Sequence, residues 1–477
     1  MSWRTPLFFG VLALLAFAFQ GTRPLAEPDE GRYVDIALQM VDSGDWWVPR
    51  LHAEEPHLAK PPLTYWLIAA SVSLFGRNEW AVRLPYGLAF LVTALLVMDI
   101  ARSLGLHSPR VAALVWATSL GALVGASFVS TDAILMTFET AAMAAALRCK
   151  TTLMWIAFGL AFLTKGPPGL LPLVALLVFV ALRDRDPRAA LRVLADPVGV
   201  PCFLLLGFGW FASMIARDTS LASYFLGYEL LDRVATGVHG RNQHWWGALS
   251  VYAPTLALGV LPWVVPIAWA PRTSGGLSSP ARRLLWIWIA VPLAAFALSR
   301  SRLPLYVLPL FVPMALLIAP RVAALAVPYP RRMAAVGGAW VVLVLTFKAF
   351  GAHQPESVDA KAMAARAEEI AGGMSSRMDE IVFVDAKPAY GLRFYTGLPI
   401  ERVRLLGDPD PSPEPGATTP SVCAEAEEPE HPLWLVPQSR AAFFEREVRA
   451  CGLTPSLLVG DWERLRPYEV LAQVAAN

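Results

Sequence analysis

Two adjacent carboxylates, Asp29 and Glu30, stand in the segment EPDEGRYVDIALQM, shortly after an apolar run. Arg32 follows Asp29 by three residues, a spacing at which two side chains share one face of a helix. A carboxylate beside a cation can accept the proton of a substrate hydroxyl, which is the task of a general base. Acidic side chains are also favourable at a helix N-terminus, where they serve as caps. Catalysis and capping both stay open for this pair, and Tyr33 lies on the apolar side of the same expected helix.

Three basic residues stand beside prolines or in short turns between apolar segments. Lys60 lies in HLAKPPLTYW, Lys165 in LTKGPPG and Arg302 in SRSRLPLY. A cation that is held rigidly beside a membrane suits a lipid phosphate, because it needs little reordering to meet the anion. The alternative for Lys60 is that its ammonium group only reaches out to lipid headgroups. We interpret all three as candidates for binding a phosphate.

Further polar residues stand in two other connections between apolar segments. Asp132, in STDA, lies at the end of such a segment, where an ionisable residue must face water or have a partner. The loop YELLDRVATGVHGRNQHWWG mixes charges with aromatic rings, which suits a sugar because rings stack on pyranose C–H groups. Its candidate sugar or acceptor contacts are Glu229, Arg241, His244 and Trp245. Tryptophans are common at membrane interfaces, so the aromatic pair alone is weak evidence. These motifs do not require a metal, and the histidines available to a divalent metal are His57, His239 and His244.

The composition shows which elements must carry these residues. The chain has 477 residues, of which 56% are hydrophobic and 16% charged, against about 25% charged in soluble domains. It is therefore expected to be an integral membrane protein in contact with membrane lipids. The net charge is +2 and no block of like charges is present, which argues against a nucleic-acid partner.

A helix needs about 20 apolar residues to cross a membrane, fewer when neighbouring helices shield it. This rule predicts about eleven transmembrane helices, near 5–21, 82–102, 110–128, 133–148, 151–164, 168–183, 199–216, 249–270, 283–299, 304–320 and 333–350. The arginine-rich short connections all fall on one side, which the positive-inside rule makes cytoplasmic. Every polar motif above then lies on the outer side. The predicted spans carry few charges, with Asp99 and Glu139 near their ends, which argues against a transporter or flippase.

After Phe350 the composition becomes charged and soluble. Short apolar runs predict strands near 380–385, 399–404 and 433–437, with helices near 357–373, 387–396 and 439–451. We therefore predict a transmembrane domain at 1–350, with interfacial amphipathic helices in its first outer loop, and an extracytoplasmic α/β domain at 351–477. Cys423 and Cys451 are the two cysteines of this tail, and in an oxidising compartment they are candidates for a disulfide.

The order of these motifs resembles that of the membrane glycosyltransferases of the type-C fold that use polyprenyl-phosphate sugars. The similar branch holds the lipid A aminoarabinose transferases and the bacterial enzymes that resemble dolichyl-phosphate-mannose protein mannosyltransferases. The resemblance runs from about Pro24 to about Pro320, and the soluble tail is also similar. It is carried by the DExRY-type start, SGDWWVPR, KPPLTYW, AVRLP, the TD turn, TKGP, RNQHWW and SRSRLPLYVLP.

The resemblance implies a bacterial enzyme of the cytoplasmic membrane whose active site faces the periplasm. The donor would be a polyprenyl-phosphate sugar, the acceptor a glycolipid or protein, and transfer would invert the anomeric carbon. Asp29 matches the catalytic acidic residue, and Arg32, Lys60 and Asp132 match polar residues of the same cavity. Glu30 and Tyr33 join the candidate sugar or acceptor contacts.

The chain departs from the aminoarabinose transferases at one position. Those enzymes carry an acidic residue immediately before the KP pair, where it helps to hold a metal, and this chain has Ala59. Metal dependence therefore stays open. Aminoarabinose transfer to lipid A is an alternative within the same class of enzyme.

Overall fold

The computed structural model describes residues 4–51, 56–186, 188, 194–232, 242–264, 276–353, 359–372, 379–405, 421–426, 432–437, 439–457 and 468–476. The chain forms two compact units. The first comprises Met1–Gln20, Ala59–Thr64 and Arg83–Phe350, and the second comprises Gly21–Leu58, Tyr65–Val82 and Gly351–Asn477.

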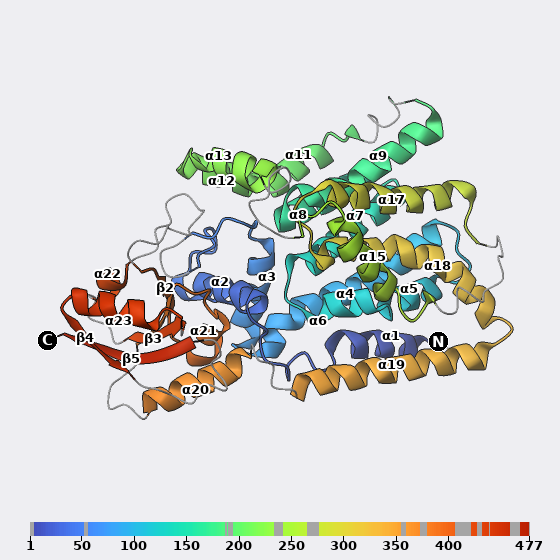
Figure 1. The fold of residues 1–477 in the computed structure, drawn as a ribbon. Helices are drawn as coiled ribbons and strands as arrows, with labels where there is room; N and C mark the ends of the chain where they lie inside the picture. The colour runs from blue at the N-terminus through green and yellow to red at the C-terminus, as the bar shows by residue number, and fades with distance from the viewer. Residues whose placement is uncertain are drawn as a thin grey trace. The chain divides into compact units, whose positions relative to one another are not determined.

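The first unit is helical (Figure 1). Its α-helices are α1 (Arg4–Phe17), most of α4 (Glu79–Ser103), α5 (Pro109–Ala117), α6 (Leu120–Ser127), α7 (Thr131–Leu147), α8 (Thr151–Lys165), α9 (Leu171–Asp184), α11 (Gly199–Phe203), α12 (Gly209–Arg217), α13 (Leu221–Ser223), α15 (Gly247–Gly259), α17 (Ser279–Leu298), α18 (Phe311–Ala326) and most of α19 (Pro330–His353). The 3₁₀ and π segments are η1 (Pro167–Leu170), η2 (Leu204–Phe208), η3 (Tyr224–Asp232) and η4 (Pro304–Leu310).

Among the described residues, six segments are long and apolar enough to cross a membrane, and they are Glu79–Ser103, Pro167–Asp184, Gly199–Arg217, Ser279–Leu298, Pro304–Ala326 and Pro330–Ala352. The pair α5 and α6 passes the same test but bends by 61° at the break. Several other predicted spans correspond to shorter apolar helices, such as α1, α8 and α15. The prediction of a multi-pass helical membrane protein is confirmed, and the number of eleven crossings stays a prediction.

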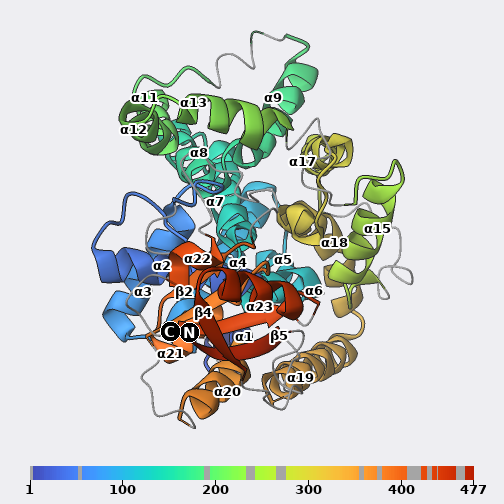
Figure 2. The same cartoon turned by 60° about the vertical axis from the view of Figure 1, so that its left-hand side comes forward.

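Helices α7 and α8 lie side by side in both views (Figures 1 and 2). Ser130 precedes α7 in an extended conformation, and α8 ends where Gly166 adopts a φ of 73° ahead of two prolines. Glycine takes this left-handed φ without a steric penalty, so the helix stops at Lys165. Glu139 was expected near the end of a span, and this was wrong, because it lies buried in the middle of α7.

The second unit contains helices and a five-stranded sheet. The helices are α2 (Asp29–Ser43), most of α3 (Leu63–Phe75), α20 (Ala360–Gly372), α21 (Gly391–Thr396), α22 (Val422–Ala426) and α23 (Ala441–Ala450). The strands are β1 (Glu380–Val384), β2 (Ile400–Val403), β3 (Pro432–Pro437), β4 (Leu453–Leu457) and β5 (Tyr468–Ala476), in the order β2-β1-β3-β5-β4. Strands β2 and β3 pair parallel to β1, whereas β5 pairs antiparallel to both β3 and β4. The α/β fold predicted for the C-terminal tail is confirmed, whereas the domain bounds of 351–477 stay a prediction.

The apolar run of β1 shows why the sheet is covered on both faces. Ile381 and Phe383 pack in one core cluster with residues of α20 and α21. Val382 and Val384 pack in a second cluster with residues of α22 and α23. Successive strand residues point to opposite faces, so an uninterrupted apolar run requires helices on both.

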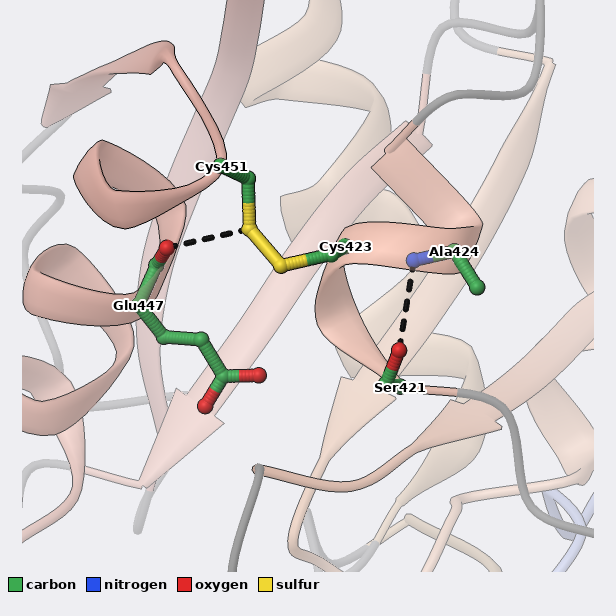
Figure 3. The surroundings of a disulfide bond; sticks show 5 residues. All are labelled: Ser421, Cys423, Ala424, Glu447 and Cys451. Atoms are coloured by element: carbon green, nitrogen blue, oxygen red, sulfur yellow. Dashed lines mark hydrogen bonds between the residues drawn. A yellow bond between two sulfur atoms is a disulfide. The ribbon is translucent and has the colours of Figure 1, made fainter.

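Cys423 and Cys451 form a disulfide, as hypothesised, with a Cα–Cα distance of 5.8 Å (Figure 3). The bond joins α22 to the end of α23, across a sequence separation of 28 residues. Cys149 and Cys202 are free thiols.

Replacing both Cys423 and Cys451 with alanine is expected to lower the free energy of unfolding of the α/β domain by about 3 kcal/mol, the chain-entropy value for a loop of this length. Denaturant unfolding followed by far-UV circular dichroism measures this change. In the unreduced, denatured wild-type protein, alkylation should label two cysteines. Labelling of all four would show that the bond is absent.

Candidate functional site

The N-terminus of α2 places the candidate base at the protein surface. The Asp29 side chain is 71% exposed, and its Oδ1 accepts a hydrogen bond from Arg32 Nη2 at 2.9 Å. The Arg32 guanidinium also lies over the Tyr33 ring, 5.8 Å from its centroid, and Tyr33 packs against Tyr65. The guanidinium places a positive charge next to the carboxylate. Asp29 is therefore accessible and able to accept a proton.

Glu30, the neighbouring carboxylate, has a different environment. Its side chain is 2% exposed, Oε1 accepts from Arg23 Nη2 at 2.6 Å and Oε2 accepts from the Ala26 backbone N–H at 2.9 Å. Both oxygens therefore hold the chain that precedes α2. These contacts give Glu30 a structural role, while its contact with sugar or acceptor stays a prediction.

Two further carboxyl groups of the second unit are buried where α2 meets α21. Glu27 Oε1 accepts from the Gly391 N–H at 2.6 Å, and burial raises the pKa of Glu27 to about 8. Asp35 is 1% exposed, and burial raises its pKa to about 7 although Arg393 Nε lies 3.6 Å from its Oδ1. Protonation of Glu27 and Asp35 therefore stabilises the folded unit. This stabilisation is complete below the pKa that the two groups have in the unfolded chain, and it is lost as the pH rises through their folded pKa values of about 8 and about 7. Neither Glu27 nor Asp35 was predicted from the sequence as a functional residue.

In the first unit, Lys165 and Asp132 form a buried ion pair. Asp132 lies in the first turn of α7 and Lys165 is the last residue of α8, so each charge is at the helix end that favours it. Both side chains are 8% exposed. The Lys165 ammonium also lies 4.3 Å from the centroid of the Tyr306 ring in η4. The structure thus brings the predicted site residues Asp132 and Lys165 together. It also places Tyr306, which was not predicted from the sequence, beside Lys165.

Unpaired buried polar groups accompany this ion pair. The Tyr252 hydroxyl interacts electrostatically with Tyr306, Arg302 and Asp132. It has no hydrogen-bond partner among the described residues, and the same holds for the hydroxyls of Ser130 and Ser301, which neighbour Asp132 and Arg302 in sequence. Buried polar groups are normally hydrogen-bonded, so these donors are available to a ligand. A cation together with free hydroxyl donors suits an anion such as a phosphate.

Arg302 holds the turn that contains the RNQHWW stretch. Its Nη1 donates to the backbone oxygens of Asn242 and His244 at 2.8 and 2.9 Å, and its Nη2 donates to Ala297 O at 3.0 Å. Its buried Nε has no partner among the described residues. The His244 ring stacks on Trp246 at 5.4 Å, and Trp245 is 91% exposed. Arg302 therefore holds the backbone at Asn242 and His244, next to the predicted contact Trp245. Binding of a phosphate by Arg302 stays a prediction, for which its Nε is available.

The other predicted site residues are more scattered. Lys60 is partly exposed and its Nζ donates to Ala59 O at 2.9 Å, and Glu229 accepts a long hydrogen bond of 3.5 Å from the Tyr224 hydroxyl. Arg241 and His239 lie outside the described residues. Within the described part of the chain, no group of three or more His, Cys, Asp or Glu side chains is arranged to hold a metal ion.

The chain is similar to known proteins in sequence and in fold. Residues 59–206 match the family model described as dolichyl-phosphate-mannose-protein mannosyltransferase. The undecaprenyl phosphate-alpha-4-amino-4-deoxy-L-arabinose arabinosyl transferase of Pectobacterium carotovorum is 31% identical over 332 residues, which is 66% of this chain and 58% of that protein. The protein of Sodalis glossinidius whose name is the same with the number 1 added is 33% identical over 313 residues. This match covers 62% of this chain and 55% of that protein. The matched part thus spans little more than half the length of these relatives.

The fold is also shared with a solved structure. ArnT from Cupriavidus metallidurans, crystallised bound to undecaprenyl phosphate, superimposes with a TM-score of 0.76 at 24% identity, and the match covers 99% of both chains. The predicted fold class is therefore confirmed. The resemblance to membrane glycosyltransferases of the type-C fold that use polyprenyl-phosphate sugars is confirmed as well.

Proposed function

We propose that this multi-pass membrane protein is a glycosyltransferase that takes a sugar from a polyprenyl-phosphate donor and attaches it to an acceptor outside the cytoplasm. The observation that carries the proposal is the Lys165–Asp132 ion pair beside Tyr306, together with the Tyr252 hydroxyl, which has no hydrogen-bond partner among the described residues. The relatives' names, which include undecaprenyl phosphate and an arabinosyl transfer, support the same class of donor.

A sugar linked through a phosphate is already activated, which defines what the protein must supply. The acceptor oxygen forms a bond to the anomeric carbon, the bond from that carbon to the phosphate oxygen breaks, and polyprenyl phosphate leaves. Attack from the face opposite the phosphate inverts the anomeric carbon. The protein has to accept the acceptor's proton and stabilise charge on the departing phosphate.

The roles of the residues follow from their environments. We assign proton acceptance to Asp29, whose carboxylate is exposed and paired with Arg32. We assign the donor phosphate to Lys165, supported by Tyr252, and to Lys60, whose ammonium is partly exposed. Buried positive charge that is placed before the reaction stabilises developing negative charge without reorganisation.

We further propose that the enzyme lies in the bacterial cytoplasmic membrane, with the α/β domain and the residues assigned above facing the periplasm. The arginine-rich connections favour this orientation. The disulfide between Cys423 and Cys451 is typical of an oxidising compartment. The acceptor is a glycolipid such as lipid A, or a protein.

The relatives favour aminoarabinose as the transferred sugar, whereas Ala59 departs from their pattern. Mass spectrometry of envelope glycolipids and glycoproteins distinguishes these possibilities. Cells that lack the protein should lose one sugar mass from one acceptor class, and the wild-type protein, but not Asp29→Asn, should restore it. The mass that is lost shows whether the transferred sugar is a pentosamine or a hexose. Unchanged glycolipids and glycoproteins would overturn the proposal.

A further inference from the structure

Helix α21 of the α/β domain contacts α2 through two glycines and one carboxylate. A Cβ atom on Gly31 would lie 2.2 Å from Glu27 Oε1 and 2.5 Å from the Gly391 nitrogen. A Cβ atom on Gly391 would lie 2.3 Å from Glu27 Oε1 and 2.8 Å from Ala360 Cβ. Neither position has room for a side chain, so the Glu27 carboxylate fills the space between the two helices and accepts from the Gly391 N–H.

Arg393, two residues further along α21, binds the middle and the end of α2. Its Nη2 donates to Asp42 Oδ2 at 2.8 Å, and its Nε lies 3.6 Å from Asp35 Oδ1. The Arg393 carbonyl oxygen accepts from Arg77 Nη2 at 2.8 Å. The Arg393 and Asp35 side chains are 11% and 1% exposed, so solvent screens this pair little, whereas the Asp42 partner is half-exposed.

Tyr395 of α21 holds the chain that leads into α2. Its hydroxyl accepts from the Leu25 N–H at 2.9 Å and lies 3.4 Å from Glu79 Oε1, to which it donates. Helix α21 has only six residues, yet it makes contacts at three places along α2 and the chain before it. Tyr395 contacts the chain before α2, Gly391 contacts the first turn of α2, and Arg393 contacts its end.

Asp29 depends on these contacts for its position. Its side chain is largely exposed, and its ion pair is with Arg32 of the same helix. A local pair of this kind orients the carboxylate relative to α2 but does not place α2 itself. A misplacement of about 1 Å can reduce an enzymatic rate by about a hundredfold.

We propose that α21 is a clamp that sets the position of α2, and that Glu27, Gly391 and Arg393 are positioning residues for Asp29. The inference rests on the role proposed for Asp29, whereas the contacts of the clamp stand independently of it. The α/β domain would thereby take part in the transfer reaction without touching the substrate.

Gly391→Ala in the full-length protein tests the clamp, because the added methyl group must push α21 away from Glu27. Hydrogen exchange of the α2 amides between Tyr33 and Met40 should become at least about tenfold faster. Turnover should fall about tenfold or more, while the KM for the donor stays within about twofold. Gly351→Ala is the matched control, since its Cβ would have nothing within 4 Å, and it should behave as wild type.

Arg393 variants test the same inference without adding bulk. Arg393→Met should reproduce the loss of turnover, and Arg393→Lys should restore part of it because the charge remains. Asp42→Asn, whose side chain is 51% exposed, should fold normally and show a smaller loss of about two- to fivefold.

The outcomes separate the clamp from the proposed function. Unchanged exchange in α2 for both Gly391→Ala and Arg393→Met would overturn the clamp, even where Asp29→Asn abolishes transfer. Faster exchange with wild-type turnover would overturn the positioning role. Absence of sugar transfer by the wild-type protein would overturn the proposed function, and the exchange measurement would still decide whether α21 holds α2.

Discussion

Asp29→Asn is expected to lower turnover by about a hundredfold or more while leaving the fold and donor binding intact. The amide keeps the shape of the side chain, but it carries no charge and accepts no proton. A hundredfold corresponds to about 2.7 kcal/mol of activation free energy, which is the scale of general base catalysis. The side chain is exposed and its pair with Arg32 is local, so the substitution should change stability little. Single-turnover kinetics with a polyprenyl-phosphate sugar measure the effect.

Glu30→Gln is the control for Asp29→Asn. Glu30 is buried and bound by Arg23 and the Ala26 N–H, so the loss of its charge should cost about 1 to 3 kcal/mol of stability. Turnover by the folded fraction should remain within a few fold of wild type. An active Asp29→Asn together with an inactive but folded Glu30→Gln would show that Glu30 is the catalytic carboxylate. If both variants stayed active, the base would have to be sought at Asp132 or Glu229.

Lys165→Met is expected to have the second large effect, because it should impair both donor binding and folding. It removes the cation that we assign to the donor phosphate, and it leaves Asp132 as an uncompensated buried charge. Removal of one partner from a buried pair typically costs about 3 to 5 kcal/mol. Thermal unfolding in detergent and binding of a polyprenyl phosphate measure the two effects separately.

The double variant Asp132→Asn/Lys165→Met separates folding from binding. It removes both charges, so most of the lost stability should return, whereas binding of polyprenyl phosphate and sugar transfer should not. Recovery of transfer by the double variant would contradict the assignment of Lys165 to the phosphate. Tyr252→Phe removes a hydroxyl that has no hydrogen-bond partner in the described part of the chain, so it should weaken binding without a loss of stability.

The fold was largely predictable because its elements are marked by uninterrupted apolar runs. The run IVFV and the apolar stretches near 400 and 433 predicted the three parallel strands close to their observed bounds. Strands β4 and β5 were not predicted. β4 contains Pro455, which lowers strand propensity and is tolerated there because β4 is an edge strand of the sheet.

The candidate site was predictable only in part. The pair Asp29 and Arg32 is local, so its spacing in the sequence revealed it. Asp132 and Lys165 were each selected from their positions at segment ends, but the contact between them depends on how α7 packs against α8. Glu27, Asp35 and Arg393 were missed because their partners lie about 350 to 360 residues away in sequence. Nothing in the local sequence indicates such a partner.

The distance along the chain between α2 and α21 also has a consequence for biosynthesis. Nearly all of α2 from Glu30 to Met40 is buried in the finished protein, yet Gly391 is synthesised about 350 residues after Ser43. At about 5 to 20 residues per second, the ribosome needs roughly 20 to 70 s to make that stretch. During this interval the face of α2 that carries Gly31, Asp35 and Asp42 lacks its partner helix. Chains that terminate before residue 391 should therefore leave this face uncovered and be degraded as unassembled proteins.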